Sequence, residues 1–445
     1  MLLSGKTVVL GVSGSIAAYK IPTLARLLKK QGCNVQVLMT QNATQFINPI
    51  TFESLTGNKC LIDTFDRNFQ YSVEHVALAK QADIVMVAPA SANVIGKIAY
   101  GIADDMLTTT VMACPCKKMI SPAMNHNMYH NPIVQDNIQK LERFGYEMIA
   151  PDRGMLANGD DGDGRMPEPE VLFEYILREL AFEKDLAGKK VLVTAGATME
   201  AIDPVRYITN HSSGKMGCAV AKAAMQRGAK VTLVAGHMEF LPPMFVDVVN
   251  VKSAADMFEA VTKLAPEQDI IVKAAAVADY TPVAVADNKI KKSDDDMKIE
   301  LKRTKDILGY LGQHKRDGQV ICGFSMETQN MLENSKAKLA KKNLDCKGLR
   351  YTDIKDRVKK VAVSSGAGGS NVFDAALAGV DVLVTGEIKH HEIIAANSLG
   401  IDIIDAGHFK SEDIVILPLV NKLSKEFSEI IFTKSQSCDD MIKFI

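Results

Sequence analysis

The chain has 445 residues, which at about 150 residues per domain suggests roughly two to four domains. Its residues are 47% hydrophobic and 24% charged, a composition that is typical of globular proteins and argues against long disordered segments. The 52 Lys and Arg residues nearly balance 53 Asp and Glu residues, giving a net charge of -1. Bulk binding of nucleic acid, which needs a basic surface, is therefore disfavoured.

The sequence shows no sign of export or membrane insertion. No apolar run approaches the roughly 20 residues that cross a bilayer, and Lys6 follows the first apolar residues too soon for a signal peptide. The eight cysteines are scattered, and Cys114 and Cys116 form a close pair without a second pair at zinc spacing. We expect reduced thiols and a cytoplasmic protein that associates with neither membrane nor nucleic acid.

One structural unit is predicted three times along the chain. It consists of a short strand rich in β-branched residues, a Gly/Ser-rich turn and an amphipathic helix, with strands at 7–10, 191–194 and 361–363. Strands separated by helices are typical of parallel α/β sheets with right-handed crossovers, which bind ligands beyond the carboxyl ends of their strands. The sequence predicts three α/β segments, at 1–185, 186–345 and 346–445.

The first segment places polar turns after its predicted strands. Gly11-Val-Ser-Gly-Ser15 lies between a strand and a helix, where free amides and the helix dipole favour a phosphate. Three further clusters follow, at 88–93 (Ala-Pro-Ala-Ser-Ala-Asn), 101–108 and 121–125 (Ser-Pro-Ala-Met-Asn). The alternative is that these residues are helix caps and turns, where Ser, Asn and Asp are common.

Taken together, these motifs resemble the flavin-dependent cysteine decarboxylase family. Glu74-His75-Val76 and the stretch 159–166 match as well. More narrowly, residues 1 to about 345 resemble the bifunctional phosphopantothenoylcysteine decarboxylase/phosphopantothenate–cysteine ligase family of coenzyme A biosynthesis. The resemblance implies a flavodoxin-like decarboxylase domain that binds FMN. The positions that it assigns to FMN are Gly11, Ser13, Gly14, Ser15, Thr40, Ser91, Ala92, Asn93, Met106, Leu107 and Thr108.

The resemblance also implies a decarboxylation in which the flavin oxidises the cysteinyl side chain to a thioaldehyde, an electron sink, and later returns hydride. His75 is the expected base, because its ordinary pKa lies near the working pH. Asn125 is expected to hold the substrate carboxylate. The family's Gly-x-Leu-Ala-Cys-Gly arm supplies the last proton from its Cys, but here Asn158 takes that place. An amide is not a useful acid, so either water or another acid acts in a working variant, or turnover stops at the enethiol.

A second set of specialised residues follows the strand at 191–194. The stretches 195–198, 202–206 and 208–217, with three later ones, match the ligase half of the same family. This implies that CTP, with Mg²⁺, activates the carboxylate of 4′-phosphopantothenate as an acyl cytidylate that the amine of cysteine attacks. Asn210 is expected in the acyl-cytidylate step and Arg206 at the substrate. The other substrate and CTP positions are Lys273, Ala274, Ala275, Asp279, Lys289, Lys305, Asp306, Ile307, Leu308, Phe324, Lys338 and Lys342.

After Asp345 the sequence leaves the ligase pattern before its closing strands. Residues 346–445 resemble instead the carboxyl half of the dinuclear-metal family called GTP cyclohydrolase I type 2 homologue. The resemblance implies that His408 and Glu412 are metal ligands. Two ligands do not complete the coordination of a metal ion, so another subunit or water would have to supply the rest. We expect a fusion that keeps decarboxylase capacity, with an open ligase sheet edge and impaired ligation. A natural fusion and a sequence assembly or reading-frame error both remain open.

Two alternatives compete with this interpretation. The flavin fold could act on another cysteinyl substrate, such as a peptide's terminal cysteine, or prenylate a flavin. The chain could also be a non-catalytic flavin- or metal-binding fusion. The ligase motifs favour the coenzyme A reading, because they supply the preceding step of one pathway. The expected partners are small molecules, namely phosphopantothenate, cysteine, CTP and phosphopantothenoylcysteine. Family flavin sites usually form between subunits, which implies a homo-oligomer.

Overall fold

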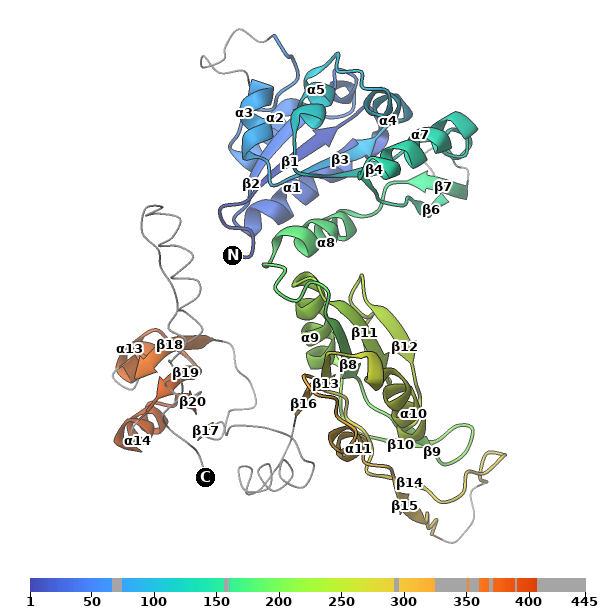
Figure 1. The fold of residues 1–445 in the computed structure, drawn as a ribbon, viewed down its shortest axis with the longest axis vertical. Helices are drawn as coiled ribbons and strands as arrows, with labels where there is room; N and C mark the ends of the chain where they lie inside the picture. Colours follow the sequence, from blue (N-terminus) through green and yellow to red (C-terminus); the bar gives the residue numbers. More distant parts are fainter. Residues whose placement is uncertain are drawn as a thin grey trace. The chain divides into compact units, whose positions relative to one another are not determined.

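The structure is a computed structural model that describes residues 1–65, 74–155, 159, 161–291, 296–324, 350–351, 360–367, 371–388 and 390–405. The chain divides into two compact units (Figure 1), one formed by 1–305 and 316–322 and the other by 306–315 and 323–445. Among the described helices, none has the length and apolar character that a membrane span requires. The predicted cytoplasmic location stays a prediction.

The first sheet is parallel, with strand order β2-β1-β3-β4-β5. Its strands are β1 (Thr7–Val12), β2 (Asn34–Met39), β3 (Ile84–Ala90), β4 (Lys117–Pro122) and β5 (Glu147–Met148). This order is that of the flavodoxin-like doubly wound fold, in which the ligand crevice lies where the order reverses, beside β1 and β3. The predicted flavodoxin-like class is therefore confirmed.

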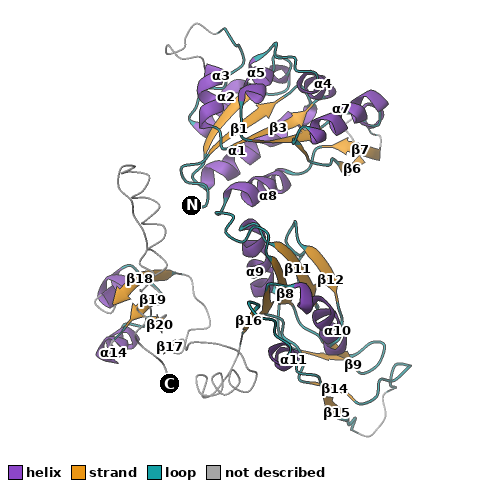
Figure 2. Ribbon diagram, viewed as in Figure 1, coloured by secondary structure: helices purple, strands orange, loops and turns teal. Residues whose placement is uncertain are grey.

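Helices cover both faces of this sheet (Figure 2). Alternate residues of β1 point to opposite faces, so Val8 and Leu10 belong to one apolar cluster and Val9 to the other. The helices that supply the two clusters are α1 (Ile21–Lys30), α2 (Pro49–Thr56) and α8 (Pro169–Leu180) on one face, and α3 (Glu74–Gln81), α4 (Ala92–Ala99), α5 (Met106–Ala113) and α7 (Pro132–Arg143) on the other.

Short elements complete this domain. The helix predicted from the glycine turn to about Gln31 is split into a 3-10 helix, η1 (Ile16–Lys20), and α1, which has a proline in its first turn. Proline fits there because the first turn leaves its N–H groups unpaired in any case. The remaining elements are η2 (Ala43–Gln45), α6 (His126–Tyr129), and the antiparallel pair β6 (Asp152–Met155) and β7 (Asp161–Arg165).

The second sheet has the order β12-β11-β8-β13-β16. Its strands are β8 (Lys190–Ala195), β11 (Lys230–Ala235), β12 (Asp247–Asn250), β13 (Ile270–Lys273) and β16 (Val320–Gly323). Its helices are α9 (Lys215–Gln226), α10 (Ala254–Leu264) and η3 (Ala265–Glu267), and α11 (Ile307–Gln313) belongs to the other compact unit. Two antiparallel pairs extend from it, β9 (Met199–Ala201) with β10 (Tyr207–Thr209), and β14 (Tyr280–Pro282) with β15 (Leu301–Arg303). Among the described residues, β16 is the last strand on its side of the sheet. The open ligase edge stays a prediction.

The third segment contains a four-stranded sheet in the order β17-β20-β19-β18. Strands β18 (Val361–Ala367), β19 (Val382–Glu387) and β20 (Asp402–Asp405) run parallel, whereas β17 (Arg350–Tyr351) is antiparallel to β20. Helices α13 (Val372–Leu377) and α14 (His390–Ser398) accompany it. The predicted α/β character is present, although β18 continues through residues expected to form a turn.

Candidate functional site

The loops that follow β1, β2 and β3 meet at one edge of the first sheet. Ser13 is fully buried, and its hydroxyl donates to the Pro89 carbonyl (2.7 Å) and accepts from the Ser91 amide (2.8 Å). The Thr40 amide donates to the Val12 carbonyl (3.0 Å). The structure therefore brings the predicted positions Ser13, Thr40 and Ser91 together where the doubly wound fold places its ligand.

Glycines allow this close approach of loops. A Cβ atom at Gly14 would lie 2.7 Å from Cβ of Asn42, in the loop after β2. A Cβ at Gly11 would lie 3.2 Å from a methyl group of Leu107 in α5. Gly14 and Ser15 are half-buried, so the turn stays accessible at its rim. A tight turn with accessible main chain fits a flavin phosphate.

Several predicted cofactor residues also cap helices. Ser91 accepts from the Val94 amide (3.4 Å) at the start of α4, and Thr108 forms a capping box with Asp105 at the start of α5. The helix-cap alternative therefore applies to Ser91 and Thr108, and their role as cofactor ligands stays a prediction. Of the remaining predicted positions, Met106, Leu107 and Thr108 have buried side chains, Ala92 is half-buried and Asn93 is exposed.

A cavity of about 500 Å³ lies beside the glycine turn. The loop after β1, the loop after β4 and the β6–β7 pair form its walls, and Ser15 and Asn125 are the predicted residues that line it. The other lining residues were not predicted as site residues, although several of them lie within the motifs quoted above. They are Ile16, Ala17, Tyr19, Lys20, Ala123, Met124, Met155, Gly164, Arg165 and Met166.

Two cations of this cavity share one carboxylate. Glu168 pairs with Lys20 (Nζ–Oε1, 2.8 Å) and with Arg165 (Nη2–Oε1, 2.5 Å). The hydrogen bond from Lys20, followed by that from Arg165, holds the pKa of Glu168 below its ordinary value. The Lys20 side chain is only 10% exposed, so this pairing also satisfies its charge. Sequence reasoning missed this group because Lys20 lies 148 positions from Glu168 in the chain.

Neither the predicted base nor the position that replaces the family's proton-donating cysteine is described as part of this cavity. His75 is the second residue of α3 and is half-buried, but it is not among the described residues that line the cavity. Asn158 lies outside the described residues. Asn125 caps α6, and its Oδ1 accepts from the Asn127 amide (2.9 Å).

In the second domain, hydrogen bonds join the end of β8 and the loop after it to the loop that follows β13. The hydroxyls of Thr194 and Thr198 accept from the amides of Ala275 and Ala278, each at 3.0 Å. The Asn210 side chain donates to the Val277 carbonyl (3.2 Å), which draws the predicted stretch 208–217 to the same place. The carboxyl ends of these two neighbouring strands therefore carry one connected surface.

Arg206 is held by a buried carboxylate. Asp203 accepts from Nε (2.9 Å) and Nη2 (2.5 Å) of Arg206, and from the amides of Val205, Arg206 and Ile290. The hydrogen bond from the guanidinium, supported by those from the amides, holds the pKa of Asp203 far below its usual range. The ion pair thereby orients the Arg206 side chain, which remains 39% exposed.

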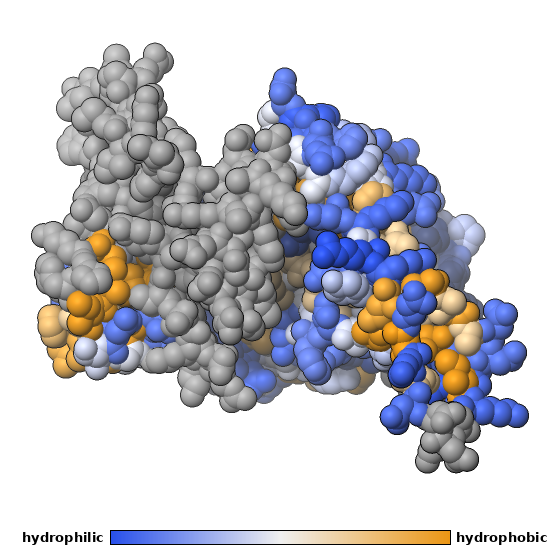
Figure 3. All heavy atoms as spheres, turned by 90° about the horizontal axis from the view of Figure 1, so that it is seen from below, coloured by the Kyte–Doolittle hydropathy of each residue, from blue (hydrophilic) through white to orange (hydrophobic). Residues whose placement is uncertain are grey.

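A cavity of about 1120 Å³ adjoins this pair. Arg206 and Lys305 are the predicted residues that line it, and Lys305 lies 4.9 Å from the centre of the Phe258 ring. Three further cations, which sequence reasoning missed, are Lys252, Lys302 and Arg303. Exposed apolar side chains also line it, and Figure 3 shows apolar and hydrophilic side chains mixed on the face that carries β14 and β15.

The other predicted ligase positions lie outside this cavity lining. Lys273 is buried at the end of β13, Ala274 and Ala275 are half-buried, and Asp279 and Lys289 are exposed. In α11, the side chain of Asp306 caps the helix, Ile307 is buried and Leu308 is half-buried. Phe324 is 53% exposed. Lys338, Lys342, His408 and Glu412 lie outside the described residues.

Two family models match the chain. A flavoprotein model covers residues 2–181, and a DNA/pantothenate metabolism flavoprotein C-terminal domain model covers residues 186–353. With the flavodoxin-like sheet, these matches define a flavoprotein of pantothenate metabolism over residues 2–181 and 186–353. The coenzyme A biosynthesis bifunctional protein CoaBC of Bacillus subtilis is 47% identical over 347 residues, 77% of this chain and 85% of that protein. CoaBC of Escherichia coli is 40% identical over 348 residues, 78% of this chain and 86% of that protein. The chain belongs to the bifunctional CoaBC family, and it is an enzyme of coenzyme A biosynthesis with a decarboxylase half and a ligase half.

Solved structures resemble single domains of the chain. A mutant PPC decarboxylase complexed with pantothenoylaminoethenethiol is 29% identical with a TM-score of 0.35, covering 38% of this chain and 96% of that one. The C-terminal domain of a CoaBC is 47% identical with a TM-score of 0.32, covering 36% of this chain and 75% of that one. The predicted family resemblance of residues 1 to about 345 is confirmed by the relatives. The resemblance of the third segment to a dinuclear-metal family stays a prediction.

Proposed function

We propose that the first domain binds FMN at the turn after β1 and decarboxylates 4′-phosphopantothenoylcysteine in the neighbouring cavity. The observation that carries this proposal is that Ser15, at the rim of the turn, and Asn125, the expected carboxylate ligand, line one cavity of about 500 Å³. Bound FMN would supply the electron sink that loss of CO2 from a cysteinyl group requires. FMN-dependent cysteine decarboxylases are among the solved structures that resemble this domain.

Asn125 is suited to hold a carboxylate by its amide nitrogen. Its Oδ1 accepts from the Asn127 amide, which fixes the orientation of the side-chain amide. The two N–H donors then lie on the opposite side, and Asn125 lines the cavity. A carboxylate accepts such donors strongly because its charge shortens and strengthens the hydrogen bonds.

Proton transfer at this site is assigned to His75 as base, with an acid other than position 158 for the last step. Histidine is the side chain that most often serves as a general base. The Asn158 amide carries no transferable proton near neutral pH, so water or another acid must donate the proton that a cysteine would have donated. Because His75 is not among the described cavity residues, this assignment is compatible with a site completed by a second copy of the chain. We accordingly propose a homo-oligomer.

For the second domain we propose that CTP and 4′-phosphopantothenate bind in the cationic cavity beside Asp203. Arg206 and Lys305, with Lys252, Lys302 and Arg303, supply positive charge for phosphate groups. Asp203 preorganises Arg206 for the phosphopantothenate, and Asn210 acts near the carboxylate that is activated. The exposed carboxylate of Asp279 has the oxygen donors that Mg²⁺ prefers, and bound Mg²⁺ would neutralise phosphate charge.

One set of incubations tests both halves. FMN-loaded protein is expected to release CO2 from 4′-phosphopantothenoylcysteine, and Asn125→Ala should lose most of that release while staying yellow. Yellow wild-type protein that releases no CO2 would contradict the decarboxylase proposal. Adding CTP, Mg²⁺, cysteine and 4′-phosphopantothenate, each omitted in turn, measures ligation separately.

A further inference from the structure

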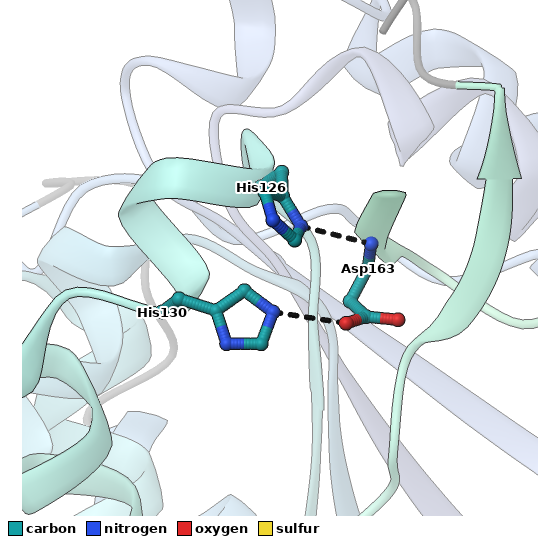
Figure 4. A group of neighbouring side chains, drawn as sticks. All are labelled: His126, His130 and Asp163. Atoms are coloured by element: carbon teal, nitrogen blue, oxygen red, sulfur yellow. Dashed lines mark hydrogen bonds and ion pairs between the residues drawn. The ribbon is translucent and has the colours of Figure 1, made fainter. Parts of the chain in front are cut away.

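Three side chains with metal-ligating atoms converge beside the first cavity without taking part in the chemistry proposed above. They are His126, His130 and Asp163 (Figure 4), and one ligand atom from each lies within 4.8 Å of the others. His126 begins α6 and His130 follows its last residue, so the two imidazoles lie one helical turn apart on the same face. Asp163 comes from β7, on a separate segment of the chain.

The donor atoms already face one another. Nε2 of His130 lies 2.9 Å from Oδ2 of Asp163, and the Asp163 amide donates to Nδ1 of His126 (3.1 Å). The two imidazole rings lie 4.4 Å apart between centroids. Because Nδ1 of His126 accepts an amide hydrogen, it carries a lone pair rather than a proton. Two imidazole nitrogens and one carboxylate oxygen can thus turn to a common point by exchanging these hydrogen bonds for bonds to a cation.

Glycines make this approach possible. A Cβ at Gly162 would lie 2.6 Å from Nδ1 of His126, and one at Gly164 would lie 2.3 Å from the Met124 carbonyl. The Met124 amide also donates to the Gly164 carbonyl (3.1 Å). The backbone of β7 is therefore held against the loop that carries His126, with a glycine on each side of Asp163.

We propose that His126, His130 and Asp163 bind one divalent transition-metal ion, with Zn²⁺ the best match. Two imidazoles and a carboxylate are ligands for borderline metals, and a tetrahedral ion with three protein ligands keeps a fourth position for water. The His130 and Asp163 side chains are 48% and 37% exposed, which gives a cation access from solvent.

The ion would clamp two walls of the cavity together. Asn125 directly precedes His126, and Gly164 and Arg165 directly follow Asp163, and all three line the cavity. A metal bound between α6 and β7 therefore fixes the spacing between the proposed carboxylate ligand and the opposite wall. Metal binding does not depend on the proposed function, whereas its effect on turnover does.

Cobalt is a suitable spectroscopic probe for this site. Full-length protein is treated with a chelator and titrated with Co²⁺, whose tetrahedral complexes absorb at longer wavelengths than flavin. One equivalent is expected to bind and to be displaced by Zn²⁺. His126→Ala, His130→Ala and Asp163→Asn should each weaken binding by about tenfold or more. The matched control is His237→Ala, an exposed histidine of the second domain, which should bind as the wild type does.

The outcomes separate the parts of the proposal. Equal Co²⁺ binding by wild type and by the His130→Ala variant would overturn the site, and strong near-ultraviolet bands would assign the ion to cysteine thiolates instead. Asp163→Asn keeps a polar side chain next to His130. If this variant loses Co²⁺ binding while its circular dichroism spectrum is unchanged, the loss cannot be attributed to misfolding. If Zn²⁺ binds but leaves KM for 4′-phosphopantothenoylcysteine unchanged in an active enzyme, the clamp is refuted. If no preparation turns over, the proposed function fails while the metal site stands.

Discussion

Ser13→Ala tests how much the hydrogen bonds between the turn after β1 and the end of β3 stabilise the domain. The Ser13 hydroxyl is completely buried and makes two hydrogen bonds, to the Pro89 carbonyl (2.7 Å) and from the Ser91 amide (2.8 Å). The Pro89 carbonyl keeps a second partner, the Ser13 amide (3.2 Å), so the principal loss falls on the Ser91 amide. A fully buried donor left without a partner costs about 1–3 kcal/mol, and because the Ser91 amide is part-buried this range is an upper bound.

The expected result is a lower unfolding midpoint of the flavin domain. For a domain of this size, each kcal/mol lowers the midpoint by about 2–4 °C, so Ser13→Ala should lower it by about 2–12 °C. The rise in flavin fluorescence as FMN is released on heating reports the unfolding of this domain alone, within the whole chain. The matched control is Ser54→Ala in α2, which removes the same hydroxyl from an exposed helical position and should change the midpoint little.

A midpoint for Ser13→Ala equal to that of the Ser54→Ala control would refute this reasoning. It would mean that water reaches the Ser91 amide or that the turn rearranges without cost. Flavin affinity, measured by titration below the unfolding range, gives a second measurement, since a loosened turn should also bind FMN more weakly.

Three further predictions follow from the sites. Asn125→Ala should lower kcat/KM for decarboxylation by about tenfold or more, because a hydrogen bond to a charged group is lost, and steady-state CO2 release measures it. Asn158→Cys should raise the ratio of fully reduced product to enethiol, measured by chromatography, because a thiol can donate the last proton; an unchanged ratio would show that water already does so efficiently. Arg206 lowers the pKa of Asp203 in the folded state. The ionised Asp203 therefore stabilises the fold at pH values above the ordinary pKa of 3.8, and this stabilisation is lost as pH falls toward the lowered pKa. The stability difference between wild type and Asp203→Asn should therefore be constant from neutral pH to about pH 5 and shrink below about pH 4, and a difference that grows on acidification would contradict the assignment.

The sequence predicted the α/β units because their local signals agree. Val8, Val9 and Leu10 form an apolar run that fits a strand buried on both faces, and a Gly/Ser-rich turn follows it. Helix ends were predicted less well, since Pro22 lies where a single long helix was expected and instead restarts it.

The cavity could not be predicted in the same way. Glu168 meets Lys20 across 148 positions of sequence, and Asp163 meets His130 across 33. Neither spacing has a helical or strand periodicity, because the contacts depend on how β6 and β7 fold back over the loop after β4. Lys252, Lys302 and Arg303 were missed for the same reason in the second domain.

The capping contacts decide which of the predicted serines and threonines can donate to a flavin phosphate. A phosphate accepts hydrogen bonds, so each hydroxyl must have its own O–H available. The hydroxyl of Ser13 already donates to Pro89, and that of Thr108 donates to Asp105. Ser15 and Ser91 instead accept from amides of the helices that they cap, which leaves their O–H groups available to a ligand. Capping and phosphate binding are therefore compatible at Ser15 and Ser91, whereas Ser13 and Thr108 serve by shaping the turn and the start of α5.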